Sequence, residues 1–309
     1  MKKIGLIVPY FGEFPNYFDL FLKSCAFNSS IDWLIFTDNE VDQLPSNVKI
    51  VPMTFGQLKS LISYKLNTSA ALPDPYKLCD YKPAYGKIFA DYLEEYDFWG
   101  HCDIDLIFGD LRQFITEEIL TEHDKIFMDG HLILYRNTKK VNHSFDLIGD
   151  KDTSFRYCIQ VPEVMYFDEW GINLLYEKYG LRQYNNPQYA DILPQSPYFR
   201  NVLFGDDQHH KNQFFQWKNG HVYKCWEENG KIQQREYSYI HLQKRAFPPH
   251  PSSLTKEEAF VISAYGFYSS NETVEINKAN YKQVFHYHVK RLKGITPIKV
   301  KRTLKGLIL

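Results

Sequence analysis

Two short apolar runs near the N-terminus constrain the fold more than any other feature of this sequence. Residues 4–8 (Ile-Gly-Leu-Ile-Val) and 33–37 (Trp-Leu-Ile-Phe-Thr) show no alternation of polar and apolar side chains. Continuous runs of this kind are typical of strands that are buried on both faces of a parallel sheet. A helical pattern that begins after Pro15 separates the two runs, and residues 49–51 are expected to form a third short strand.

Helices are expected to alternate with these strands. Residues 54–57 (Thr-Phe-Gly-Gln) have the pattern of a capping box, which marks the start of a helix. The alternation predicts an α/β domain with a mostly parallel central sheet. Ligands of such sheets bind beyond the carboxyl ends of the strands, and Tyr10, Asp38 and the aspartates of residues 103–105 lie at such positions.

The most informative polar pattern is an apolar strand, residues 97–102, that ends in Asp103 and Asp105. In an extended backbone, side chains at i and i+2 point to the same face. Two carboxylates there repel each other unless a cation lies between them, and oxygen ligands suit Mg²⁺ or Mn²⁺. Such ions often bridge the phosphates of a nucleotide. For an isolated Asp-x-Asp, the alternative is one solvated acidic residue and one helix cap.

A helix that begins near Pro83 is expected to lead into this strand. Its apolar face would consist of Tyr85, Ile88, Phe89, Tyr92 and Leu93. Asp80 and Lys82 would then lie just before its positive end. Asp110, which follows the acidic strand, is interpreted as the N-cap of the next helix and not as a ligand.

The second half of the chain carries weaker signals. Residues 125–129 and 131–136 are expected strands, residues 167–180 a helix, and Asn229 and Gly230 a hairpin turn. The polar, aperiodic residues 187–212 predict a long surface loop. Four side chains of this loop could bind a metal ion, although solvated loop residues are the simpler interpretation: Asp206, Asp207, His209 and His210.

Composition excludes several classes of protein. The 309 residues carry a formal charge of −1 and 44% hydrophobic side chains, so nothing global suggests nucleic-acid binding. The 17% aromatic content suits sugar or base pockets as well as an ordinary core. Five scattered cysteines without a C-x-x-C pair indicate neither zinc nor disulfides and fit a reducing cytoplasm. We expect no signal peptide and no membrane span.

Residues 290–309 differ in character from the rest, because seven basic residues alternate there with apolar ones and no acidic residue occurs. This pattern predicts peripheral contact with the inner face of the cell membrane. The alternative is a helix that packs on the catalytic domain. We therefore predict a nucleotide-sugar-binding catalytic domain over residues 1–250 and a helical extension with a basic amphipathic tail over residues 251–309.

Four segments together resemble a largely uncharacterised family of bacterial GT-A-type glycosyltransferases that is associated with capsule or lipopolysaccharide synthesis. They are residues 9–12 (Pro-Tyr-Phe-Gly), 77–86 (Lys-Leu-Cys-Asp-Tyr-Lys-Pro-Ala-Tyr-Gly), 97–105 (Asp-Phe-Trp-Gly-His-Cys-Asp-Ile-Asp) and 239–245 (Tyr-Ile-His-Leu-Gln-Lys-Arg). Each motif is weak alone, but the combination in this order is fairly specific. The resemblance covers roughly residues 1–250 and implies a GT-A-like, Rossmann-like fold.

The resemblance also implies a nucleotide-sugar donor, with a UDP-sugar favoured, a Mn²⁺ or Mg²⁺ ion, and a glycan or lipid-linked acceptor. Asp105 would bind the metal directly, and Asp103 would contact the metal, the donor ribose or both. His241 would complete the metal shell, and Lys244 would contact the diphosphate. The remaining expected donor-binding residues are Pro9, Tyr10, Phe11, Asp38, Asp80 and Lys82.

The stereochemistry stays open. Lys82 stands one place before the position where some retaining families have an arginine, so the match to their Lys-x-x-Asp-x-x-Arg motif is incomplete. An inverting enzyme needs a base that deprotonates the acceptor hydroxyl, and Asp168 and Glu169 are the candidates. A helix N-cap is the alternative role for Asp168.

Other classes fit less well. A phosphohydrolase of the haloacid dehalogenase type would need a longer apolar strand before its first aspartate. A nucleotidylyltransferase would need a glycine-rich, basic loop after the first strand, and residues 9–13 lack both features. A non-catalytic protein that binds sugar nucleotides would keep the same motifs, so only a turnover measurement separates it from an enzyme.

Overall fold

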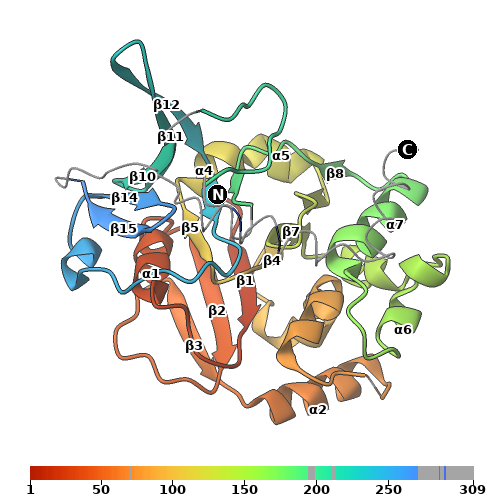
Figure 1. Ribbon diagram of the computed structural model, residues 1–309. Helices are drawn as coiled ribbons and strands as arrows, with labels where there is room; N and C mark the ends of the chain where they lie inside the picture. The colour runs from red at the N-terminus through yellow and green to blue at the C-terminus, as the bar shows by residue number, and fades with distance from the viewer. Residues whose placement is uncertain (70, 194–198, 211–212, 271–284, 286–288, 290–309) are drawn as a thin grey trace.

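The computed structural model describes residues 1–69, 71–193, 199–210, 213–270, 285 and 289. Within these residues the strands form a central seven-stranded sheet, a second sheet of five strands and a small sheet of three strands (Figure 1). All five cysteines lie among the described residues, and none of them forms a disulfide. Among the described helices, none combines the length and the apolarity that a membrane span requires.

The central sheet has the strand order β3-β2-β1-β4-β7-β6-β8. Its strands are β1 (Ile4–Pro9), β2 (Ile31–Thr37), β3 (Val48–Pro52), β4 (Phe98–Cys102), β6 (Lys125–Ile126), β7 (Leu132–Arg136) and β8 (Gln183–Tyr184). Neighbouring strands are parallel except where β7 pairs antiparallel with β4 and β6. The predicted α/β fold with a mostly parallel central sheet is confirmed.

The apolar strands are buried on both faces, as predicted. In β1, Leu6 and Val8 belong to one hydrophobic cluster, whereas Ile7 between them belongs to the other. Helix α1 (Phe18–Ala26) packs in the first cluster and helix α2 (Phe55–Leu66) in the second. Burial of each large apolar side chain contributes about 1.5–3 kcal/mol, so both layers stabilise the sheet.

The capping box at the start of α2 is present, because Thr54 and Gln57 each accept a hydrogen bond from the other's backbone N–H. The predicted helix near Pro83 differs. The chain forms a 3₁₀ segment, η1 (Pro75–Ala84), then α3 (Tyr85–Ile88) and η2 (Ala90–Tyr92). The predicted apolar face is divided between α3 and the turn that follows it: Tyr85, Ile88, Phe89 and Leu93 are buried, whereas Tyr92 is 40% exposed.

The middle of the chain contains short helices. They are α4 (Leu111–Phe114), α5 (Glu117–Glu122), η3 (Val141–Asp146), η4 (Lys151–Thr153), α6 (Phe155–Cys158), the π turn η5 (Phe167–Gly171) and α7 (Ile172–Lys178). Asp110 caps α4 by accepting a hydrogen bond from the Arg112 N–H, as predicted. Gly180, with a φ of +58°, follows the end of α7. The predicted helix over residues 167–180 therefore exists, with a π turn as its first turn.

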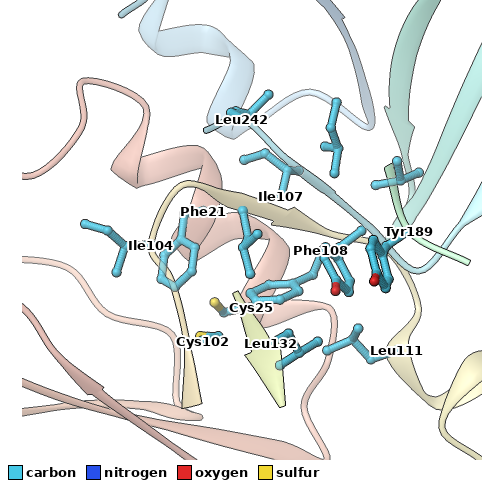
Figure 2. Packing of buried hydrophobic residues seen from close by; sticks show 14 of the residues in the cluster. Phe21, Cys25, Cys102, Ile104, Ile107, Phe108, Leu111, Leu132, Tyr189 and Leu242 are labelled. Atoms are coloured by element: carbon cyan, nitrogen blue, oxygen red, sulfur yellow. The ribbon is translucent and has the colours of Figure 1, made fainter. Parts of the chain in front are cut away.

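The small sheet joins segments far apart in the sequence. Its central strand β13 (Tyr239–His241) runs antiparallel to β5 (Leu106–Phe108) and parallel to β9 (Ala190–Asp191). The prediction of a surface loop over residues 187–212 is wrong for part of that range, because β9 lies there and several side chains are buried. Those side chains include Tyr189, Ile192 and Phe199. Figure 2 shows the apolar cluster around β5.

The second sheet has the order β12-β11-β10-β14-β15. Its strands are β10 (Phe214–Lys218), β11 (His221–Glu228), β12 (Lys231–Tyr237), β14 (Ala259–Ser263) and β15 (Gly266–Ser269). The hairpin β11–β12 projects from the body of the molecule (Figure 1), and positive φ angles at Asn229 and Gly230 confirm its predicted turn.

The predicted helical extension does not hold over residues 251–270, whereas the described residues Phe285 and Val289 are helical. A short 3₁₀ turn, η6 (Ser252–Thr255), is followed by β14, which pairs antiparallel with β10. Residues 259–269 thus continue a sheet that starts before residue 250, because alternating apolar side chains there complete its inner face. The basic tail, residues 290–309, lies outside the described residues.

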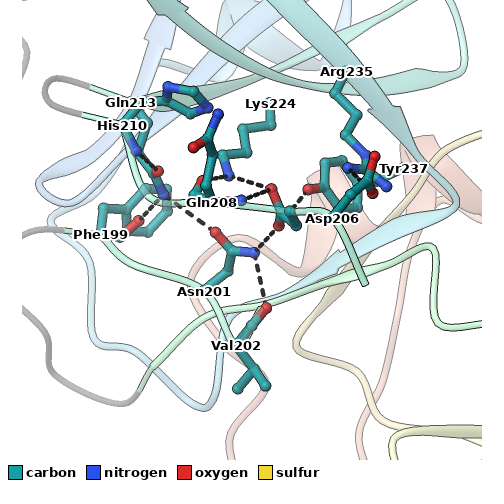
Figure 3. A network of polar contacts seen from close by, with 11 residues as sticks. Phe199, Asn201, Val202, Asp206, Gln208, His210, Gln213, Lys224, Arg235 and Tyr237 are labelled. Atoms are coloured by element: carbon teal, nitrogen blue, oxygen red, sulfur yellow. Dashed lines mark hydrogen bonds and ion pairs between the residues drawn. The ribbon is translucent and has the colours of Figure 1, made fainter. Parts of the chain in front are cut away.

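A polar network fastens the segment before β10 to this sheet (Figure 3). Asp207 accepts hydrogen bonds from Lys224 Nζ at 2.7 Å, from the Tyr237 hydroxyl at 2.7 Å and from Asn201 Nδ2 at 2.8 Å. Lys224 is fully buried. Asp207 is therefore part of a structural ion pair and neither a solvated loop residue nor a free metal ligand.

Candidate functional site

A cavity of about 740 Å³ opens beyond the carboxyl ends of β1 and β4. This is the edge of a parallel sheet at which ligands are expected to bind. The cavity is lined by ten residues that the sequence nominated: Pro9, Tyr10, Phe11, Lys82, Asp103, Asp105, Asp168, Glu169, His241 and Lys244. The structure thus brings together side chains from five separate segments of the chain.

Asp103, Asp105 and His241 form the inner part of this site. Each offers one ligand atom, and these atoms lie within 4.8 Å of one another. The register of β13 against β5 places His241 opposite Leu106, directly beside Asp105. His241 Nε2 is therefore 3.5 Å from Asp105 Oδ1.

A second carboxylate orients the imidazole. His241 Nδ1 lies 2.8 Å from Asp191 Oδ1, which also accepts a hydrogen bond from Gln243 Nε2 at 2.7 Å. With Nδ1 engaged, Nε2 faces Asp105. A carboxylate behind a histidine in this way is a common arrangement at metal sites, where it sets the ring orientation and raises the basicity of the ligand.

Electrostatics at this group suit a cation. Burial lowers the pKa of His241, but Asp105 and Asp191 outweigh burial and raise it to about 10. Burial raises the pKa of Asp105, whereas His241 and the Lys244 backbone N–H, 2.6 Å from Oδ2, bring it below its ordinary value. Protonated His241 thus places a positive charge beside the ionised carboxylate of Asp105. Two carboxylates and an imidazole are a donor set that fits Mn²⁺ or Mg²⁺.

Lys82 links the first aspartate to a third acidic group. Its ammonium donates to Asp103 Oδ1 at 2.8 Å and to the Gly130 carbonyl at 2.7 Å, and lies 3.5 Å from Asp168 Oδ2. Burial alone would lower the pKa of Lys82, but the two carboxylates outweigh burial, and the pKa lies above its ordinary value. Lys82 therefore stays charged at the centre of the site.

Asp168 and Glu169 line the cavity at the start of η5. Asp168 is 3% exposed, and its Oδ1 has no hydrogen-bond partner among the described residues. Burial raises the pKa of Asp168 to about 8, and burial also raises the pKa of Glu169. Asp168 does not cap the helix, since the turn follows Tyr166 without a side-chain cap. Gly130 packs directly on Asp168, and a larger residue there would displace the carboxylate.

Two predicted donor-binding residues lie elsewhere. Asp38 is exposed and is not among the residues that line the cavity. Asp80 is fully buried, paired with Lys77 at 2.7 Å, and accepts hydrogen bonds from the backbone N–H groups of Met165 and Phe167. Direct contact between Asp80 and a ligand does not fit this position, because both of its oxygens are engaged inside the protein.

Aromatic and basic side chains also line the cavity. Tyr10 is half-buried, stacks on Phe14 and donates its hydroxyl hydrogen bond to the Glu13 carbonyl. Lys244 is exposed, and its Nζ lies 4.2 Å from the ring centre of Tyr76. Lys244 and Gln243 both have positive φ angles, and this tight turn directs the Lys244 N–H at Asp105.

Several residues that line the cavity were not predicted from the sequence. Asp129 and His131 flank Gly130, Asp191 lies in β9, and Tyr76 and Tyr166 form part of the wall. The sequence Asp-Gly-His after a short strand could have indicated Asp129 and His131 as site residues. No local signal marks Asp191 or Tyr166, because strand pairing and loop packing bring them to the cavity.

The sequence matches the family model DUF6625, described as a family of unknown function, over residues 6–271. The chain belongs to this family. A comparison with curated protein sequences finds no match.

Solved structures give remote likenesses. The galactosyltransferase LgtC, in complex with donor and acceptor sugar analogs, is 10% identical over 60% of this chain and 75% of its own, with a TM-score of 0.35. An active-site mutant of LgtC is 9% identical over 78% of this chain and 88% of its own, with a TM-score of 0.40. The glycosyltransferase GlyE of Streptococcus pneumoniae TIGR4 is 15% identical over 60% of this chain and 46% of its own, with a TM-score of 0.33. Likeness this distant transfers no activity to this chain.

Proposed function

We propose that this protein is a metal-dependent glycosyltransferase. It moves a sugar from a nucleoside-diphosphate sugar, with a UDP-sugar favoured, to a glycan or lipid-linked acceptor in the synthesis of a surface polysaccharide such as capsule or lipopolysaccharide. The observation that carries the proposal is the meeting of Asp103, Asp105 and His241 at the inner end of a large cavity beyond the parallel strands.

On the donor side, Asp105 and His241 hold the Mn²⁺ or Mg²⁺ ion, and Asp103 contacts the ion, the ribose or both. When bound, the ion neutralises the charge that develops on the leaving diphosphate. Lys244 adds a second positive charge near the same phosphates. Tyr10 stacks on the nucleotide base, since it follows the first buried strand and lines the cavity.

The two carboxylates of η5 have different roles in this proposal. Asp168, whose pKa is raised to about 8 by burial, forms a hydrogen bond with a sugar hydroxyl. Glu169 is the general base in an inverting reaction. The acceptor oxygen attacks the anomeric carbon and its proton passes to Glu169, while the bond from that carbon to the diphosphate oxygen breaks. Retention remains the alternative stereochemical course.

The test is a panel of nucleotide sugars incubated with the purified protein, with Mn²⁺, with Mg²⁺ or with EDTA. Nucleotide release should require the metal, and Asp103→Ala and Asp105→Ala should each lower it at least 100-fold while circular dichroism stays unchanged. Asp206→Ala is the matched control, because Asp206 pairs with Arg235 on the surface away from the cavity.

Full activity of either aspartate variant with saturating Mn²⁺ would refute the metal site. Thermal stabilisation by a nucleotide sugar without any turnover would favour a non-catalytic protein that binds sugar nucleotides. Release that EDTA does not affect would refute metal dependence.

A further inference from the structure

Tyr166 has an unusual backbone conformation for a bulky residue. Its φ of +56° and ψ of 44° lie in the left-handed region, which side chains larger than asparagine rarely adopt. Its side chain lines the cavity two residues before Asp168. Backbone strain of this kind persists only where the surrounding structure imposes it, and it concentrates at functional sites.

The structure shows what imposes the conformation. Asp80 accepts a hydrogen bond from the Met165 N–H at 2.9 Å through Oδ2, and one from the Phe167 N–H at 2.8 Å through Oδ1. These are the backbone groups on the two sides of Tyr166. One carboxylate therefore clamps the chain before and after the strained residue.

The clamp is itself held from behind. Lys77 is fully buried, and its ammonium contacts Asp80 at 2.7 Å and donates to the carbonyls of Cys158 at 2.8 Å and Glu163 at 2.5 Å. Burying an ion pair is costly unless its hydrogen bonds are satisfied, and here the carboxylate and the ammonium both have partners. The pair ties η1 to the segment that carries Tyr166, Asp168 and Glu169.

Tyr76 lies beside Tyr166 in the same wall. Tyr76 is 52% exposed, and the centre of its ring is 4.2 Å from Lys244 Nζ. Burial and the neighbouring phenol of Tyr166 raise the pKa of Tyr76, so the hydroxyl stays neutral. Both side chains line the cavity, as do Lys244 and the carboxylates of η5.

We propose that Tyr76 and Tyr166 form the platform on which a ring of the acceptor sugar stacks, and that Asp80 is the positioning residue that keeps Tyr166 in place. Sugars combine C–H faces, which pack on aromatic rings, with hydroxyls that need polar partners. The platform supplies the first, and Asp168 and Glu169 supply the second. This inference rests on the proposed function and names the chemistry of its acceptor.

The test separates the ring from the backbone. Tyr166→Asn removes the ring but suits the left-handed conformation, whereas Tyr166→Phe keeps the ring. Tyr64→Asn, at an 80% exposed position on α2, is the matched surface control. The acceptor KM is measured by nucleotide release with methyl glycosides of glucose, galactose and N-acetylglucosamine as probes, and binding of UDP with Mn²⁺ is measured by calorimetry.

Tyr166→Asn should raise the acceptor KM at least tenfold and keep the Kd for UDP within twofold. Tyr166→Phe, which keeps the ring, should raise the acceptor KM less than Tyr166→Asn does, and Tyr64→Asn should change neither value by more than twofold. Asp80→Asn should raise the acceptor KM by several-fold while the Kd for UDP stays unchanged, a pattern that general destabilisation does not produce. If Asp80→Asn does not fold, the two Tyr166 variants alone decide the question.

An acceptor KM for Tyr166→Asn equal to that of the wild type would overturn the platform and leave the proposed function intact. Loss of UDP binding in Tyr166→Asn would also overturn it, because the ring would then serve the donor. Absence of nucleotide release by the wild type with every donor would refute the proposed function, and the platform with it.

Discussion

Binding of a divalent ion should displace one proton from His241, so its apparent affinity should rise with pH. Without the ion, the pKa of His241 is raised to about 10 by Asp105 and Asp191, against the effect of burial. Asp105 is already ionised at neutral pH, because its pKa lies below the ordinary value. The proton that an ion must displace is therefore the one on His241 Nε2, which lies 3.5 Å from Asp105 Oδ1.

The magnitude follows from the difference between the pKa of His241 and the pH. Below the pKa, each pH unit changes the cost of deprotonation by about 1.4 kcal/mol, which is a factor of about ten in the apparent Kd. Between pH 6.5 and 8.5 the Kd for Mg²⁺ or Mn²⁺ should fall about 100-fold. Near pH 7 binding should release close to one proton.

Isothermal titration calorimetry in two buffers with different ionisation enthalpies measures both quantities. His241→Gln is the matched variant, since glutamine keeps a polar side chain without a titrating group in this range. It should bind the ion more weakly and lose most of the pH dependence. An affinity that stays constant from pH 6.5 to 8.5 in the wild type would refute the reasoning, as would an equal slope in His241→Gln.

Three further predictions concern stability and the tail. Burial lowers the pKa of Lys125 to about 7, so the folded state binds fewer protons than the unfolded state between pH 7 and about 10. The free energy of unfolding of the wild type, relative to that of Lys125→Met, should therefore rise by about 1.4 kcal/mol per pH unit in that window. Urea titrations of both proteins at pH 7.5 and 9.5 measure this difference, and a difference that does not change with pH would contradict the prediction. Lys224→Met should destabilise the fold by about 3 kcal/mol, because it leaves the buried carboxylate of Asp207 without its cation. An unchanged thermal midpoint would show that the network in Figure 3 contributes little to stability. Finally, a chain that ends at residue 287 should sediment less with anionic vesicles at low salt than the full chain does, and equal sedimentation would exclude the basic tail as a membrane contact.

The parts of this protein that the sequence predicts correctly depend on neighbours within a few residues. The apolar runs of β1 and β2 imply burial on both faces, because side chains alternate between the two sides of a strand. The capping box at Thr54 depends on side chains three residues apart. The i, i+2 spacing of Asp103 and Asp105 after a strand is also a local property, and both side chains line the cavity.

Tertiary structure alone decides the rest. His241 reaches Asp105 because β13 pairs with β5, and Asp191 reaches His241 because β9 pairs with β13. Nothing in the local sequence encodes these pairings, which depend on how the whole chain buries its apolar surface. Asp80 shows the same limit. Its sequence context suggested a ligand contact, but burial against Lys77 turns its carboxylate towards the backbone around Tyr166, since a buried charge must be paired.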